Sequence, residues 1–200
     1  GMNMCAIDRI KAQDTDLIVT VDNGISAINE AEYIYSLGME LVVTDHHQIG
    51  ESLPRAEAVV NPHRPDNDLK FRDFAGVGVA FKLACAVYDG EVDELIEQYA
   101  DLVAIGTIGD VVPLRDENRS LVKAGLALIN ADARIGIAAL KRAAGSEENT
   151  TAVNVAFQLC PRINAAGRMD DAAKAVELLI CDDYEDAQFK ASQLDGENAH

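Results

Sequence analysis

The sequence is poor in positive charge. Its 200 residues include 17 lysines and arginines against 34 aspartates and glutamates, which gives a formal net charge of −17. A domain that binds nucleic acid on its own carries a basic face, so this balance argues against that class of protein. A metal-dependent enzyme acting on phosphates remains possible, because divalent ions then supply the positive charge and acidic side chains hold them.

Long apolar runs and paired cysteines are also missing. No apolar run approaches the roughly 18 residues of a transmembrane helix, and residues 1–14 contain no apolar core of a signal peptide. The sequence therefore predicts neither a transmembrane helix nor a signal peptide. The cysteines lie far apart and form no CxxC pair, which predicts buried, reduced thiols in a cytoplasmic protein. They are Cys5, Cys85, Cys160 and Cys181.

Two β-rich runs flank a helical stretch near the start of the chain. Leu17–Val21 and Met39–Val43 are typical of short strands, and residues 26–37 have the apolar spacing of a helix. Ser26 is a plausible N-cap, and Gly38 is a plausible residue just beyond the helix. A right-handed crossover of this length predicts two parallel strands, often as neighbours in one sheet.

The rest of the chain adds one short strand and then mainly helices. Residues 56–60 predict a third strand, and residues 101–110 fit either a helix or a fourth strand. Helices are predicted over 75–88, 92–100, 121–129, 135–144, 170–181 and 184–197. The expected fold class is α/β, with a mainly parallel sheet flanked by helices and a helical C-terminal half.

Metal-binding side chains follow the first two predicted strands. Asp22 comes directly after one strand, and Asp45, His46 and His47 follow the next. Since ligands bind beyond the carboxyl ends of parallel strands, we expect these residues roughly 5–10 Å apart at one edge of the sheet. Asp110 also follows an apolar segment. The alternative is that each lone aspartate is a helix cap or a turn former.

Carboxylate oxygen and imidazole nitrogen suit Mn²⁺, Mg²⁺ or Zn²⁺. Two such ions about 3.5–4 Å apart can activate a water and stabilise a phosphoryl group, with Asp22 as the candidate bridging ligand. The imidazole nitrogen must be unprotonated to bind, so activity is expected to fall in acid.

Several segments together resemble the DHH phosphoesterase family. They are most similar to its RecJ branch, the single-strand-specific DNA exonucleases. The resemblance runs in order from Leu17 to the C-terminus. It rests on LIVTVDNGIS (17–26), VVTDHH (42–47), VVNP (59–62), AGVGVAFKL (75–83), GDVVPL (109–114) and PRINAAGR (161–168).

The resemblance implies a set of metal ligands. Asp22 matches the bridging ligand, and His46 matches the metal ligand of the DHH motif. His47 matches the catalytic neighbour that faces the scissile phosphate, and Asp110 matches the ligand of the fourth motif. The implied reaction is hydrolysis of phosphodiesters in single-stranded DNA with Mn²⁺ or Mg²⁺, which releases 5′-nucleotides in DNA repair and recombination.

Further residues are implied around these ligands. Arg162, Asn164 and Arg168 match a loop near the substrate phosphates, where two guanidiniums could bind phosphate. From the residues alone, a surface loop with solvated arginines is an equal alternative. Asp45 and Asn23 are expected to hold the ligands in place rather than to bind the ion.

Parts of the family pattern are missing, so we expect residues 1–200 to be a truncated DHH domain. The family's first motif, an Asp-x-Asp stretch after a strand, is expected upstream of Leu17, and the DHH-associated C-terminal domain is not recognised. We therefore expect one or no well-held ion, in place of two, and weak activity from this chain alone. Alternatives are an oligoribonuclease or cyclic-dinucleotide phosphodiesterase of the same family, or a non-catalytic binding module. Protein partners are not predicted.

Overall fold

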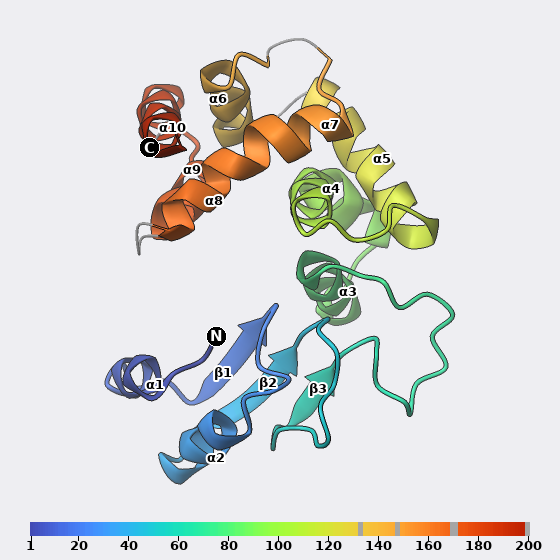
Figure 1. The fold of residues 1–200 in the computed structure, drawn as a ribbon, viewed down its shortest axis with the longest axis vertical. Helices are drawn as coiled ribbons and strands as arrows, with labels where there is room; N and C mark the ends of the chain where they lie inside the picture. The colour runs from blue at the N-terminus through green and yellow to red at the C-terminus, as the bar shows by residue number, and fades with distance from the viewer. Residues whose placement is uncertain (132–133, 147–148, 169–171, 199–200) are drawn as a thin grey trace. The chain divides into compact units, whose positions relative to one another are not determined.

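A computed structural model describes residues 1–131, 134–146, 149–168 and 172–198. The chain divides into two compact units, Gly1–Asp89 and Gly90–His200 (Figure 1). The first contains the sheet, and the second is helical in all of its described elements. This distribution confirms the predicted fold class, in which a parallel sheet flanked by helices precedes a helical half.

The sheet of the first unit has three parallel strands in the order β1-β2-β3. They are β1 (Leu17–Val21), β2 (Glu40–Thr44) and β3 (Ala58–Val60). Val21 pairs with Thr44, and Thr44 pairs with Val60, so the three strands end in one row. The residue that follows each strand therefore lies at the same edge of the sheet.

The core of this unit lies between the sheet and two helices. Helix α2 (Ile28–Ser36) connects β1 to β2, and α1 (Met4–Lys11) packs beside α2. Ile7, Ile34 and Leu41 are buried together there, which removes their apolar surface from water. Helix α1 was not predicted; Asn3 caps it by accepting a hydrogen bond from the amide of Ala6 at 2.9 Å.

The second unit is built from helices around one apolar core that includes Ile137, Leu159 and Leu178. Residues 101–109 belong to a helix and Asp110 caps its C-terminus, so the strand alternative is wrong there. Together with α3 (Gly76–Val87) of the first unit, the remaining elements are α4 (Val92–Gly109), α5 (Asp116–Ala131), α6 (Ile135–Ala143), α7 (Ala152–Asn154), the π-helix η1 (Val155–Leu159), α8 (Cys160–Arg168), α9 (Ala173–Leu179) and α10 (Tyr184–Asn198).

The loop expected at residues 161–168 is wrong: these residues form most of α8. A π-helical turn just before α8 accommodates Pro161. The amide of Cys160 donates to the carbonyl of Val155, five residues earlier. Pro161 has no N–H, and it lies where the hydrogen bonds change from the π-helical to the α-helical pattern. Ala165 and Ala166 are buried, so the small residues serve helix packing.

No helix among the described residues is long and apolar enough to cross a membrane.

The cysteines differ in their burial. All four cysteines are free, but Cys160 is the one that is buried, whereas Cys5 is exposed on α1. The prediction of buried thiols is therefore confirmed for Cys160 only. Cys85 and Cys181 are partly buried, and Cys5 is exposed because α1 turns Ile7 into the core in its place.

Candidate metal centre

The site begins with the residues that follow the three strands. The amide of Asp22 donates to the carbonyl of Thr44 at 3.0 Å, and the amide of Asp45 donates to the carbonyl of Val60 at 3.1 Å. These bonds continue the parallel ladder one residue beyond each strand. They fix the backbones of Asp22 and Asp45 side by side at the carboxyl edge, as the sequence predicts.

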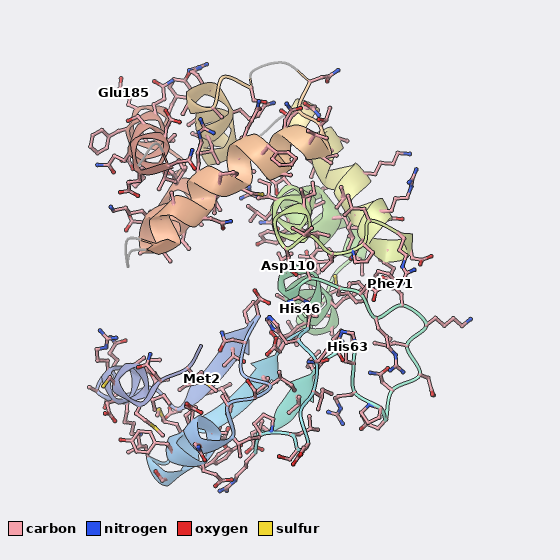
Figure 2. All side chains as sticks on the ribbon, viewed as in Figure 1. Met2, His46, His63, Phe71, Asp110 and Glu185 are labelled. Atoms are coloured by element: carbon pink, nitrogen blue, oxygen red, sulfur yellow. The ribbon has the colours of Figure 1, made fainter. Side chains whose placement is uncertain are left out.

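Asp22 turns the chain sharply at this edge. Its φ is 62°, in the left-handed region, which aspartate tolerates better than most residues. His46 follows β2 (Figure 2). Oδ1 of Asp22 lies 3.0 Å from Nε2 of His46. The Asp22 side chain is about half exposed and the His46 side chain is largely buried, with relative exposures of 52% and 12%.

His47 completes a three-residue cluster. One ligand atom from each of Asp22, His46 and His47 lies within 4.8 Å of the others. The two imidazole rings are 4.5 Å apart between centroids. Among the residues that the structure describes, this is the one group of three or more carboxylate, imidazole or thiol side chains gathered closely enough to hold a metal ion.

Asp45 holds the two histidines of this cluster in place through hydrogen bonds. Its buried carboxylate accepts hydrogen bonds from the amide of Ile25 at 2.9 Å, the amide of His46 at 2.8 Å and Nδ1 of His47 at 2.7 Å. Burial of the Asp45 carboxyl raises its pKa, but these hydrogen bonds outweigh burial, so that the pKa is lowered overall. Asp45 is therefore a charged anchor for both histidines.

The Nδ1 contact also sets the tautomer of His47. A carboxylate accepts and does not donate, so Nδ1 carries the proton and Nε2 of a neutral ring keeps its lone pair. Histidines that bind metals typically donate their other ring nitrogen to a carboxylate in this way.

Asn61 belongs to the same support and was missed by the sequence reasoning. It follows β3, lies buried, and donates from Nδ2 to the carbonyl of His47 at 3.0 Å. Its Oδ1 accepts from the amide of His63 at 2.8 Å. The signal was present, because Asn61 follows the third strand just as Asp22 and Asp45 follow the first two.

The donor set fits a divalent cation. The carboxylate of Asp22 and the imidazoles of His46 and His47 offer oxygen and nitrogen donors without thiolate, which suits Mn²⁺, Mg²⁺ or Zn²⁺. Beside them a cavity of about 470 Å³ is lined by Asn23, Ser26, Glu30 and Gln48, among others. Asn23 donates from Nδ2 to the carbonyl of Val21 at 3.1 Å, which stiffens the turn after Asp22.

Asp110 lies in the second unit, where it is exposed and caps the C-terminus of α4. The next residue, Val111, has a φ of 59° and is 87% exposed. A β-branched residue in that conformation is a backbone outlier. Whether Asp110 joins Asp22 and His46 as a ligand stays a prediction.

The residues predicted near the substrate phosphates lie on α8. Arg162 pairs with Asp195 of α10, with 2.8 Å from Nε to Oδ1, and its Nη1 donates to the carbonyl of Gln158 at 2.7 Å. Asn164 is exposed on the same helix. The side chain of Arg168 lies outside the described residues. Binding of phosphate by these three residues stays a prediction.

The comparisons with known proteins show the family of the chain. The model of the DHH family, N-terminal domain, matches residues 3–107, which is more than half of the chain. The chain belongs to the DHH family. The sequence Asp45-His46-His47 spells DHH, and its two histidines belong to the candidate metal-binding cluster.

Several relatives in the DHH family carry a functional name. The chain is 42% identical to the single-stranded-DNA-specific exonuclease RecJ of Bacillus subtilis over 98% of its own length. It is also 42% identical to the protein of the same name from Escherichia coli over 99% of its length. The chain spans 24% and 37% of these two relatives.

Solved structures in the DHH family show the same fold. A crystal structure of exonuclease RecJ bound to manganese matches with a TM-score of 0.86 and 41% identity, over 100% of this chain and 50% of the other. RecJ of Thermus thermophilus in complex with Mn²⁺ matches with a TM-score of 0.82 and 42% identity, over 96% and 29%.

Proposed function

We propose that this chain is the metal-binding core of a single-stranded-DNA exonuclease that depends on Mn²⁺ or Mg²⁺. The observation that carries the proposal is the convergence of Asp22, His46 and His47 at the carboxyl edge of the sheet. It is supported by relatives named as single-stranded-DNA-specific exonucleases and by similar RecJ structures that contain manganese.

The residues of the cluster take different roles in this proposal. Asp22 and His46 would hold the ion, and the second carboxylate oxygen of Asp22 would be available to a neighbouring ion. His47, fixed by Asp45, directs Nε2 toward the scissile phosphate. A bound pair of ions supplies an activated water and stabilises the phosphoryl oxygens. Asp110 is proposed as a further ligand from the second unit.

Substrate binding is proposed to use α8. A guanidinium has five N–H donors, and the contacts of Arg162 to Asp195 and Gln158 use three of them. The remaining donors can reach phosphate oxygens without breaking the ion pair. Asn164 and Arg168 are proposed to contact neighbouring phosphates of the same single strand.

We further propose that both units form one DHH domain and that the protein is cytoplasmic, which agrees with its free cysteines. The chain alone is expected to be a poor nuclease. Its described residues provide one close cluster of ligands, whereas the reaction needs ions on both sides of the phosphate. Its net charge of −17 also weakens capture of DNA.

The test is release of nucleotides from 5′-labelled single-stranded DNA with Mn²⁺, with Bacillus subtilis RecJ as the positive control. We expect slow release that His46→Ala abolishes. Asp68→Asn is the matched control, because Asp68 is an exposed carboxylate of the same unit outside the cluster. Release that persists in His46→Ala, or equal activity on duplex DNA, would contradict the proposal.

A further inference from the structure

The start of α3 lies directly behind the Asp22 side chain. Gly76 is the first residue of this helix. A Cβ built on Gly76 would overlap three atoms of Asp22, namely Oδ1, Cβ and Cγ. Carbon atoms in contact are normally about 3.5–4.0 Å apart, so no side chain fits at position 76 while Asp22 keeps its place.

Asp22 cannot move out of the way by rotating its side chain. Its Cβ is one of the overlapped atoms, and the position of Cβ is set by the backbone. That backbone is held by the hydrogen bond to the carbonyl of Thr44 and by the left-handed turn. A side chain at Gly76 must therefore displace either this turn or the first turn of α3.

The start of α3 is itself held firmly. Phe74 and Ala75, which precede the helix, are 4% and 1% exposed. The amide of Gly78 donates to the carbonyl of Ala75 at 2.9 Å. The positive end of the helix macrodipole also favours a carboxylate at this position. The first turn of α3 is thus held in place where it packs against Asp22.

Gly78 provides a contrast two residues along the same helix. A Cβ there would lie 3.1 Å from Cδ1 of Phe74, which is a side-chain atom, and 3.5 Å from Cβ of Phe74. A small shift of the Phe74 ring relieves that contact. The two glycines share a helix and a gain in helix propensity on substitution by alanine, but Gly76 alone abuts a candidate metal ligand.

We propose that Gly76 is a positioning residue for the metal centre. Its missing side chain lets α3 press against Asp22 and hold Oδ1 of Asp22 at 3.0 Å from Nε2 of His46. This inference rests on the proposed metal-binding role of Asp22, and it adds that the spacing of the two ligands depends on a residue that contacts no ion.

The first experiment is a double-mutant cycle on the metal-free chain, combining Gly76→Ala with Asp22→Gly. Glycine adopts the φ of position 22 without strain and removes the overlapped atoms. We expect Gly76→Ala to lower the melting temperature by about 2–10 °C in the wild-type background. In the Asp22→Gly background the drop should be under about 2 °C.

This cycle stays informative if Gly76→Ala alone does not fold, because the double variant is then expected to fold. An equal drop in both backgrounds would overturn the inference, since the overlap with Asp22 would not be the cause. A double variant that also fails to fold would overturn it as well.

The second experiment measures the Kd of Mn²⁺ for the same variants by calorimetry. We expect Gly76→Ala to weaken binding about 10–100-fold, as changes behind metal ligands typically do, and Gly78→Ala to stay within about threefold of the wild type. Unchanged affinity in Gly76→Ala, or an equal loss in Gly78→Ala, would overturn the inference.

The Asp22→Gly variant separates the two proposals. If it loses Mn²⁺ affinity while Gly76→Ala does not, the metal site stands and the positioning role of Gly76 fails. If Asp22→Gly binds Mn²⁺ like the wild type, Asp22 is not a ligand, and both proposals fail together.

Discussion

His46 Nε2 lies 3.0 Å from Asp22 Oδ1, although the two residues follow different strands. The cause is the register of the sheet, in which Val21 pairs with Thr44. Parallel strands that end in one row bring their next residues together at one edge. The spacing of these two candidate ligands thus depends on the register of the sheet and on the contact of α3 with Asp22.

The Asp45 carboxylate should be required for the fold of this edge. We expect Asp45→Asn to lower the free energy of unfolding by about 2–3 kcal/mol, since the amide cannot accept all the hydrogen bonds that the carboxylate receives. Chemical denaturation at pH 7 measures this, with Asp68→Asn as the exposed control. Equal stability of the two variants would contradict the anchoring role.

The Asp45 carboxylate should also make the stability of the folded chain depend on pH in the acid range. The pKa of Asp45 is lower in the folded chain than its ordinary value, so its contribution to stability is present above about pH 4 and is lost as the pH falls through the folded-state pKa. The acid limb of a stability curve should therefore be shallower in Asp45→Asn. An acid limb with the same slope in Asp45→Asn would show that other carboxylates account for the loss of stability in acid.

The proximity of Asp22 and His46 could be predicted because their strands are consecutive in the chain and adjacent in the sheet. Asp22 and His46 follow consecutive strands joined by one helix, so a local pattern was enough. Asn61 was missed although its strand was predicted, because the prolines that follow it are typical of a loop. The contact between Gly76 and Asp22 joins segments that lie far apart in the chain, so a local sequence pattern could not reveal it.

Val111 offers a test of backbone strain in the second unit. Its amide donates to Ile108, just as the amides of Gly38 and Gly145 donate at the ends of α2 and α6, and all three residues have positive φ. Glycine suits this conformation and valine does not.

We expect Val111→Gly to raise the free energy of unfolding by about 0.5–1 kcal/mol, after allowing for the greater freedom of glycine in the unfolded chain. Chemical denaturation measures the change. Val112→Gly is the control and should lower stability, because Val112 has an ordinary φ and is half-buried. A destabilised Val111→Gly variant would show that the valine side chain makes stabilising contacts.

Cys160 should be inert in the folded chain. Burial raises the pKa of its thiol to about 11, so very little thiolate exists at pH 8. We expect alkylation of Cys160 by iodoacetamide to be more than about 100-fold slower than that of the exposed Cys5, followed by peptide mass spectrometry. Similar rates at the two cysteines would show that the core around Cys160 opens readily.

The sequence predicted that the second half is helical, but it did not predict the helix at residues 161–168. The sequence favours a loop at residues 161–168 because Pro161 and Gly167 commonly interrupt helices. The π-helical turn that accommodates Pro161 depends on the packing of Val155 and Leu159 in the core, which a single sequence does not reveal. Local propensity is overridden there by tertiary packing.

The position of Mn²⁺ in crystals of this chain tests the metal centre most directly. Anomalous scattering at the manganese edge locates the ion without reference to activity. We predict a peak about 2.0–2.2 Å from both a carboxylate oxygen of Asp22 and Nε2 of His46, which is lost in His46→Ala. Crystals saturated with Mn²⁺ that show no peak there, or a peak bound by other residues, would contradict the account.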